Sequence, residues 1–357
     1  MTKPIQFGYC APIFAWPGGN LFRTPSMARL DGGAAVASAA RAEALGYDSL
    51  WVADHLMLGQ EQAILEGWTT LAAIAGATRR ARLGIIHQAH YFRHPAVAAK
   101  MMATLDVLSG GRFIWFADTG TRGSEHHAYG LPWPTAMEAR MPDLLEGIDL
   151  ILKLWQAREA EPLTFDGRFY QVREAVCKPG PVQQPHPPIW FGEAHPLTLA
   201  AAARLGQGWN SAPVSLAELD RRLAGLKAAC GAAGRDWTEL ELSHETQILI
   251  AEDAAGVRAQ VRAMLALTPG ENMPSGQATP KGEDFAAFVS GATEAYPRYL
   301  TEAWLVGTPD QIEAQLRAQI ARGISHFMLW FMDAPSEAGL RLFAERVMPR
   351  FRGGGNG

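Results

Sequence analysis

Chemically active residues stand directly after several apolar runs of this sequence. The run SLWVAD (49–54) ends on Asp54 and is followed by His55. An imidazole gains and loses a proton near neutral pH, so His55 could act as a proton donor or acceptor, with Asp54 or a backbone carbonyl fixing its tautomer. A histidine at the end of a strand can also be a hydrogen-bonded structural residue, and its type alone does not separate the two roles.

Two further segments carry groups that could bind a phosphate. In FGEAHPLTLAAAA (191–203) a strand passes directly into a helix. The backbone N–H groups of Glu193, Ala194 and His195 would therefore stand at a helix N-terminus, where anions are favoured. The segment DTGTRG (118–123) offers small hydroxyl residues and backbone donors as a second set. Ordinary strand-to-helix connections and plain turns share both patterns, so the two interpretations stay open.

These segments need a scaffold that brings them together. Short runs rich in β-branched and aromatic residues alternate with alanine-rich amphipathic stretches, which is typical of repeated βα units around a parallel sheet. The predicted strands are 5–10, 49–54, 81–88, 112–118, 188–192, 208–212, 240–251 and 325–332. The predicted helices are 34–45, 67–79, 95–108, 137–156, 196–205, 216–233, 254–267, 309–322 and 336–348. Eight unbroken repeats predict an α/β fold, a closed (β/α)8 TIM barrel whose strand ends share one rim.

The chain of 357 residues contains no linker, so a single domain over residues 1–357 is expected. Two stretches interrupt the repeats. Residues 161–188 predict a hairpin followed by a proline-stiffened crossing. Residues 267–299, just after the seventh strand, are polar, rich in Gly and Pro, and too long for an ordinary connector, which predicts a lid or a disordered insertion. The tail 352–357 is expected to be flexible.

Composition argues against several classes of function. The formal net charge of −4 comes without any block of Lys or Arg, so neither nucleic acid nor a membrane is an expected partner. The 3 cysteines lie far apart and the 10 histidines occur without an HExxH motif, so no metal site is expected. The sequence contains no GxSxG elbow and no GxGxxG after the first strand. Without a signal-peptide pattern, we expect a cytoplasmic protein acting on a small-molecule substrate.

Taken together, the motifs closely resemble those of the bacterial luciferase-like, flavin-dependent monooxygenases. The stretches that carry the resemblance are EALGYDSLWVADHL (43–56), RHPAVAAKMMATLDVLSGGRF (93–113), EHHAYGLPWP (125–134), TFDGRFYQVREAVCKPGPVQQPHPPIWFGE (164–193), AARLGQGWN (202–210) and GTPDQIEAQLRAQIARGISHFMLWF (307–331). The resemblance implies a TIM barrel with a mobile insertion after strand seven, a homodimer or homotetramer, and reduced FMN at the carboxyl rim. It also implies a separate NAD(P)H:flavin reductase that supplies the reduced cofactor.

The resemblance further implies which residues meet the flavin. The residues matching the phosphate site after strand five are Gly192, Glu193, Ala194 and His195, and those on the strand-four loop are Thr119, Gly120 and Thr121. The ring system rests on the end of strand three, often over a cis peptide, and this stretch is His87, Gln88 and Ala89. The histidine of the family's strand-two DH motif lies near the reactive ring, and His55 matches it.

Four other residues receive possible roles from the resemblance. Arg122 and Tyr129 lie on the strand-four loop, where the family places residues near the flavin, although Tyr129 could equally be a packing residue. Trp330 closes strand eight and could wall the substrate pocket or belong to the core. Arg298, in the insertion, could contact an anion when a lid closes, or could be a solvated loop arginine.

The activity implied first is a two-component monooxygenase, in which reduced FMN and O2 oxygenate a small organic substrate. One alternative is a deazaflavin-dependent oxidoreductase that transfers hydride on the same barrel. Thr121 stands where alcohol-oxidising members of that group place a glutamate, which favours FMN. Another alternative is a non-catalytic flavin-binding protein, which the full set of repeats argues against. Glu245 and Gln247 stand where sulfonate-oxidising relatives use an arginine, so a sulfonate substrate is disfavoured.

Overall fold

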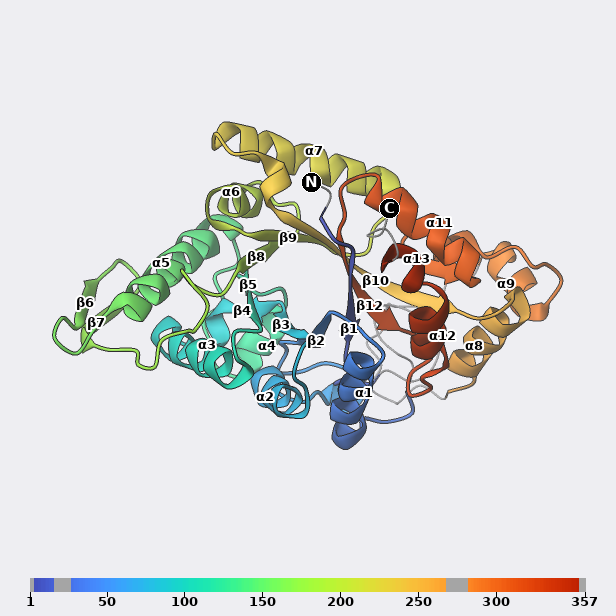
Figure 1. The fold of residues 1–357 in the computed structure, drawn as a ribbon, viewed down its shortest axis with the longest axis horizontal. Coiled ribbons are helices and arrows are strands. Elements are labelled where there is room, and N and C mark those ends of the chain that lie inside the picture. The colour runs from blue at the N-terminus through green and yellow to red at the C-terminus, as the bar shows by residue number, and fades with distance from the viewer. Residues whose placement is uncertain (1–2, 16–26, 268–281, 353–357) are drawn as a thin grey trace.

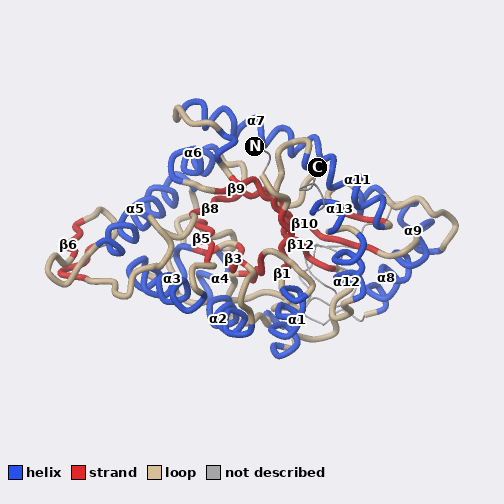
Figure 2. The backbone as a smooth tube through the Cα atoms, viewed as in Figure 1, coloured by secondary structure: helices blue, strands red, loops and turns tan. Residues whose placement is uncertain are grey.

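Eight parallel strands close into a barrel in the computed structural model, which describes residues 3–15, 27–267 and 282–352. The barrel strands are β1 (Gln6–Cys10), β2 (Ser49–Ala53), β3 (Arg82–Ile86), β5 (Phe113–Asp118), β8 (Ile189–Gly192), β9 (Gly208–Ser211), β10 (Glu241–Ile250) and β12 (His326–Phe331). Each pairs with its neighbour, and β1 pairs with β12 to close the ring, which Figure 2 shows end-on. Every predicted strand is present, so the predicted TIM barrel is confirmed.

Helices surround this ring (Figure 1). They are α1 (Gly32–Ala44), α2 (Gly67–Ala77), α3 (Pro95–Ser109), α4 (Gly123–Ala128), α5 (Met137–Gln156), α6 (Pro196–Leu205), α7 (Leu216–Ala232), α8 (Ala254–Ala266), α9 (Glu283–Ser290), α10 (Arg298–Thr301), α11 (Pro309–Ile320), α12 (Ala338–Arg346) and α13 (Pro349–Arg352). Local caps define where they begin. The Asp31 carboxylate accepts a hydrogen bond from the backbone of α1, and Thr308 forms a capping box with Gln311 in α11.

The two predicted interruptions differ in structure. In the first, β6 (Leu163–Asp166) and β7 (Gln171–Ala175) form an antiparallel hairpin at the left edge of Figure 1. In the second, residues 268–281 lie outside the described part of the chain, and α9 and the start of α10 make up most of the rest. Of the predicted tail 352–357, only Arg352 is described.

One strand was not predicted from the sequence pattern. The short β11 (Leu305–Gly307) pairs with the carboxyl end of β10, outside the barrel. Three residues are too few to show the alternation of apolar and polar positions by which a strand is recognised. Beside β11, a second apolar cluster includes Val261 of α8, Phe288 of α9 and Trp304, and it attaches these helices to the barrel.

The middle of the barrel is filled by large side chains that pack on glycines. Trp51 of β2 and Trp190 of β8 both lie inside, with ring centroids 5.4 Å apart. A Cβ atom on Gly84 of β3 would lie 2.1 Å from Cζ3 of Trp51, and one on Gly208 of β9 would lie 2.4 Å from Nε1 of Trp190. Only glycine leaves room for the two indoles, which form a packed layer across the barrel.

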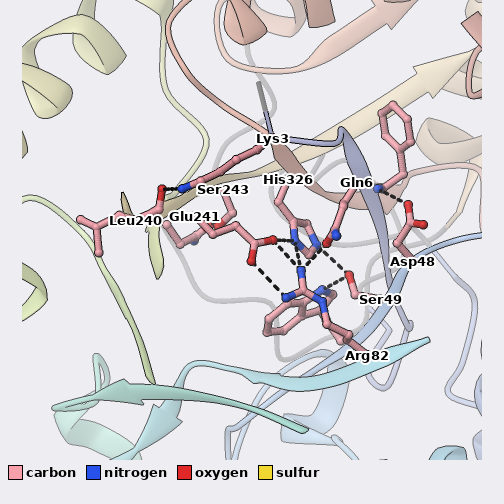
Figure 3. A network of polar contacts seen from close by, with 12 residues as sticks. Lys3, Gln6, Asp48, Ser49, Arg82, Leu240, Glu241, Ser243 and His326 are labelled. Carbon is pink, nitrogen blue, oxygen red and sulfur yellow. Dashed lines mark hydrogen bonds and ion pairs between the residues drawn. The ribbon is translucent and has the colours of Figure 1, made fainter. Parts of the chain in front are cut away.

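An ionic network lies at the amino-terminal end of the barrel strands (Figure 3). The Arg82 guanidinium contacts both carboxylate oxygens of Glu241, at 3.0 and 2.5 Å, and Nδ1 of His326 lies 2.8 Å from the same carboxylate. Burial alone would raise the pKa of Glu241, but His326 and Arg82 outweigh it and lower the pKa to about 2. The carboxyl rim, at the opposite end of the barrel, carries the residues predicted to bind the cofactor.

Candidate active site

His55 and Glu125 form a hydrogen-bonded pair at the carboxyl rim. His55 follows β2, and Glu125 lies in α4, the short helix after β5. Nδ1 of His55 is 2.8 Å from Oε1 of Glu125, while Oε2 accepts hydrogen bonds from the backbone N–H groups of Leu56 (2.6 Å) and Met57 (3.2 Å). One carboxylate therefore holds both the imidazole and the backbone that carries it. The Glu125 side chain is 1% exposed, whereas the His55 side chain is 22% exposed.

The electrostatics of the pair favour an ionised carboxylate. Burial alone would raise the pKa of Glu125, but the hydrogen bonds from His55 and from the backbone of Leu56 and Met57 outweigh burial and lower the pKa. An ionised carboxylate only accepts hydrogen bonds, so it keeps the imidazole hydrogen on Nδ1 and leaves Nε2 as the proton acceptor. This corrects the prediction that Asp54 or a backbone carbonyl fixes the tautomer of His55, because Glu125 does so.

Asp54 instead holds the neighbouring strand end in place. Its carboxylate accepts hydrogen bonds from both terminal nitrogens of Arg93 at 2.8 Å and from the backbone N–H of Ala89 at 2.9 Å. Arg93 also pairs with the more exposed Glu66 at 2.8 Å. Because Ala89 belongs to the stretch predicted to carry the cofactor ring, Asp54 fixes the backbone of that stretch.

The third strand is interrupted at His87. The peptide bond between Ile86 and His87 is cis, as the family resemblance implies, and the strand resumes as β4 (Gln88–Ala89), which pairs with β5. The His87 ring packs edge-on against Phe116, with centroids 4.4 Å apart. Within the described residues, Nε2 of His87 and Oε1 of Gln88 are buried without a hydrogen-bond partner. Such orphaned atoms are rare in folded proteins, and each needs a partner such as an ordered water or a bound ligand.

One pocket at the rim brings together predicted residues from three distant segments. Its lining includes His55, His87, Ala89, Gly120, Thr121 and Arg122, together with Asp54, Asp118 and Glu125. Arg122 contacts the carboxylate of the His55–Glu125 pair, since its Nε lies 3.3 Å from Oε1 of Glu125. Gly192 borders the same place, because a Cβ atom there would lie 3.5 Å from the His87 ring.

Two predicted residues of the strand-four loop lie at the margin of this pocket. The Thr119 side chain is buried, and its hydroxyl contacts Sδ of Met137 at 3.7 Å. Tyr129 is 57% exposed, and its hydroxyl donates to the carbonyl of Leu56 at 3.4 Å. Tyr129 thus covers the backbone beside His55 without lining the pocket.

The turn after β8 is only partly available to a phosphate. Glu193 has a φ of +69°, and its N–H donates to the carbonyl of Asn210 at 3.1 Å. The prediction that this N–H faces an anion is therefore wrong. His195 caps α6 through its own ring, and Arg222 lies 3.3 Å from the Glu193 carboxylate. The N–H groups of Ala194 and His195 bond to no other described residue, so they remain as anion donors.

A second group of polar side chains lies inside the barrel, on β9, β10 and β12. Trp330 is buried, and its Nε1–H donates to Oε1 of Glu245 at 2.8 Å. The other carboxylate oxygen of Glu245 lies 3.8 Å from Nε2 of His87 and has no hydrogen bond within the described residues. Nδ2 of Asn210 and both amide atoms of Gln247 are orphaned in the same way. Trp330 therefore orients a carboxylate whose second oxygen is still unsatisfied.

Arg298 is not brought to this site. Its side chain is 83% exposed at the start of α10, and its guanidinium lies 3.5 Å from the carboxylate of Glu302. The structure therefore favours the interpretation as a solvated arginine over that of a pocket residue.

Neither a metal site nor a membrane span is found in the residues that the structure describes. Among these residues, no group of three or more His, Cys, Asp or Glu residues could hold a metal ion. The same residues contain no helix with the length and apolar character needed to cross a membrane. The three cysteines, Cys10, Cys177 and Cys230, are buried free thiols.

Comparison with known proteins agrees with the fold. Residues 5–326 match the luciferase-like monooxygenase family, and the chain therefore belongs to this family. Among solved structures, monooxygenase RslO1 from Streptomyces bottropensis is 26% identical, with a TM-score of 0.69 over 97% of this chain and 100% of that one.

Several curated relatives have names that include the cofactor F420. The F420-dependent glucose-6-phosphate dehydrogenase of Microbacterium testaceum is 28% identical over 99% of both chains. The F420-dependent hydroxymycolic acid dehydrogenase of Mycobacterium tuberculosis is 31% identical over 63% of this chain and 61% of that one. An F420-dependent secondary alcohol dehydrogenase, 20% identical with a TM-score of 0.71, shares the fold over 98% of this chain. The chain is thus a luciferase-like oxidoreductase.

Proposed function

We propose that this protein is a deazaflavin-dependent oxidoreductase that transfers hydride between coenzyme F420 and a small organic substrate. Deazaflavin-dependent hydride transfer was one of the alternative activities predicted from the sequence. We now prefer it to the FMN-dependent monooxygenase. The full-length similarity to F420-dependent dehydrogenases supports the change of cofactor. The observation that carries the proposed chemistry is the hydrogen bond of 2.8 Å between His55 and Glu125, which places a proton acceptor at the rim.

The residues at the rim fit a deazaflavin ring. The ring system has a polar edge with hydrogen-bond donors and acceptors, and the orphaned atoms of His87 and Gln88 offer partners to such an edge. Ala89 and Gly120 line the pocket beside them, and the N–H groups after Glu193 would meet the phosphate of the tail. When bound, the cofactor supplies a carbon that accepts or donates two electrons as hydride.

The protein's own chemistry is then control of one proton. When a substrate alcohol is oxidised, its hydroxyl proton must leave, and Nε2 of His55 is placed at the rim to accept it. Glu125 stabilises the imidazolium that forms, because its carboxylate already accepts the hydrogen bond from Nδ1. In the reverse direction the same imidazolium returns the proton to a carbonyl oxygen. The backbone bonds to Leu56 and Met57 keep this geometry fixed between turnovers.

The FMN-dependent monooxygenase remains as a second candidate. Two observations favour it: the 26% identity to monooxygenase RslO1, and Thr121 at the position where alcohol-oxidising deazaflavin enzymes place a glutamate. Only this candidate requires O2 and an NAD(P)H:flavin reductase. Assembly as a homodimer or homotetramer stays a prediction under either candidate.

A binding experiment separates the two candidates. Purified protein is titrated with F420 and, anaerobically, with reduced FMN, and cofactor fluorescence or absorbance gives each Kd. We expect F420 to bind at least tenfold more tightly. Tight binding of reduced FMN, followed by a peroxyflavin spectrum on mixing with air, would support the monooxygenase instead. Replacing His55 with Ala should lower turnover much more than cofactor affinity, and equal losses in both would indicate a structural role for the imidazole.

A further inference from the structure

His126 follows Glu125 in α4, but its side chain meets a different part of the rim. Consecutive residues of a helix project roughly 100° apart. Glu125 contacts His55, whereas the His126 ring packs against Phe92 and Trp133. His126 is 1% exposed, and the proposed proton chemistry does not use it. One short helix therefore sends two adjacent side chains to two different places.

Four side chains form a chain of stacking contacts that passes through His126. The ring centroid of His126 lies 4.6 Å from that of Phe92 and 4.4 Å from that of Trp133, with interplanar angles of 33° and 37°. The Arg140 guanidinium lies 4.2 Å from the Trp133 centroid. These distances are typical of favourable aromatic and cation–π contacts. We call Phe92, His126, Trp133 and Arg140 the rim stack.

The rim stack begins in the segment after strand three, which is predicted to carry the cofactor ring. Phe92 ends the short 3-10 helix η2 (His90–Phe92), which directly follows Ala89. The next residue, Arg93, is held by the Asp54 carboxylate at 2.8 Å. The backbone beside Phe92 is therefore anchored to the barrel, and its ring gives His126 a fixed surface on which to pack.

The strand-four loop is the second segment that the rim stack contacts. Nδ1 of His126 donates to the carbonyl of Arg122 at 2.9 Å, and Arg140 donates to the carbonyl of Gly120 at 2.9 Å. A Cβ atom on Gly120 would lie 3.3 Å from the His126 ring, so this backbone packs closely on the imidazole. Thr121, between the two bonded carbonyls, is exposed and lines the rim pocket. The loop is thus fixed on both sides of Thr121.

The two segments depend on side chains for their spacing. Backbone pairing between them ends with Ala89 of β4 and Asp118 of β5. Beyond that pair the rim pocket opens, and Phe92, Gly120 and His126 all line it. A closely packed ring resists compression, so the His126 imidazole sets how far apart the segment after strand three and the strand-four loop lie.

His126 acts in this place as an uncharged ring. Burial lowers the pKa of His126, so the imidazole is neutral near pH 7. Its hydrogen is on Nδ1, where the Arg122 carbonyl accepts it, and Nε2 is buried without a partner among the described residues. A neutral ring with one hydrogen bond suits a packing role better than proton transfer.

We propose that His126 is a positioning residue for the cofactor, because it sets the distance between the segment after strand three and the strand-four loop. The inference rests on the proposed function in one respect, that the cofactor binds between these two segments. Helix α4 then serves both parts of the reaction. Glu125 orients the proton acceptor His55, and His126 spaces the two walls that meet the cofactor.

The test uses two substitutions at position 126 of the full-length protein. Fluorescence titration with F420 gives the Kd of each variant. We expect His126→Ala to bind F420 at least about tenfold more weakly, because the spacing ring is lost. His126→Phe keeps an aromatic ring in the stack, so its Kd should stay within about threefold of the original value. An unchanged Kd in His126→Ala, or equal losses in both variants, would overturn the inference.

His127 provides a matched control, because it is the next residue of α4 and is exposed. His127→Ala should leave the F420 Kd unchanged. A loss as large as that of His126→Ala would overturn the inference, since the effect would then belong to α4 as a whole. If His126→Ala does not fold, Trp133→Leu tests the stack at a half-buried position. We expect it to weaken F420 binding about fivefold, and an unchanged Kd would overturn the inference.

Hydrogen exchange of the cofactor-free protein separates this inference from the proposed function. The backbone amides of residues 119–123 should exchange at least about tenfold faster in His126→Ala, whereas those of α7 should be unchanged. Unchanged exchange at residues 119–123 would overturn the positioning role even if F420 binds. Failure of the original protein to bind F420 would refute the proposed function, and the exchange rates would still decide whether His126 holds the loop.

Discussion

Nδ1 of His55 lies 2.8 Å from Oε1 of Glu125, although 70 positions separate the two residues in the chain. The contact joins the end of β2 to the helix that follows β5. Through Leu56 and Met57 it also fixes the backbone at the start of the loop after β2. The Glu125 carboxylate therefore sets the tautomer and the orientation of the His55 imidazole, and it also holds the backbone next to His55.

Replacing Glu125 with Gln should lower turnover about 100-fold, the scale of positioned acid–base catalysis. The amide cannot stabilise an imidazolium, and it can present a donor to Nδ1 and so favour the wrong tautomer. The F420 Kd should change less than about threefold, which titration would show. Asp149→Asn, which removes an exposed ion pair with Lys153 on α5, is the matched control and should keep full activity. An equally large loss of F420 affinity in Glu125→Gln would contradict the proposal that Glu125 acts only in proton transfer through His55.

Asp54→Asn should destabilise the protein by about 3 kcal/mol, because it leaves the buried Arg93 without its bidentate partner. The Asp54 side chain is 1% exposed, whereas that of Glu66, the other partner of Arg93, is 41% exposed. Glu66→Gln should therefore cost only about 0.5 kcal/mol. Urea unfolding measures both values. Similar losses of unfolding free energy in the two variants would show that Asp54 is not the dominant partner of Arg93.

Gly84→Ala should destabilise the barrel by about 2 kcal/mol or more, because the new methyl group would collide with the Trp51 indole. The control is Gly76→Ala in α2, where an added Cβ meets no atom within 4 Å. That change should stabilise the protein by up to about 1 kcal/mol, since alanine favours a helix. Thermal unfolding should show a lower Tm for Gly84→Ala and an equal or higher Tm for Gly76→Ala. A stable Gly84→Ala protein would mean that the indole layer can shift.

The ionic network at the amino end predicts a pH dependence of stability. The folded pKa of Glu241, about 2, lies below the usual 4.5, so its ionised form stabilises the fold above pH 4.5. This stabilisation, about 3 kcal/mol, should be lost as pH falls from about 4.5 to about 2. The difference in unfolding free energy between the original protein and Glu241→Gln should therefore shrink over that interval. If this difference in unfolding free energy stays constant down to pH 2, ionised Glu241 is not the source of the pH-dependent stability.

The sequence supported the barrel far better than the details of the site. Strand patterns need only local alternation and turn residues, so even the short strand at 208–211 was predicted. Glu125 was missed as the partner of His55 because it lies in EHHAYG, where nothing local indicates which residue faces a histidine on another strand. Asp54 received the wrong role for the same reason. The N–H of Glu193 was predicted to be free, and only the packing of β8 against β9 shows that it is bonded.

The sequence by itself determined the order and type of the elements, and it therefore determined which residues would reach a common rim. It also carried the family motifs, because these are runs of neighbouring residues. Tertiary structure alone decided which rim residues touch, such as His55 with Glu125 and Trp330 with Glu245, and which buried atoms stay without partners. These contacts depend on the closure and stagger of the strands, which set distances between residues far apart in the chain, and no local pattern encodes those distances.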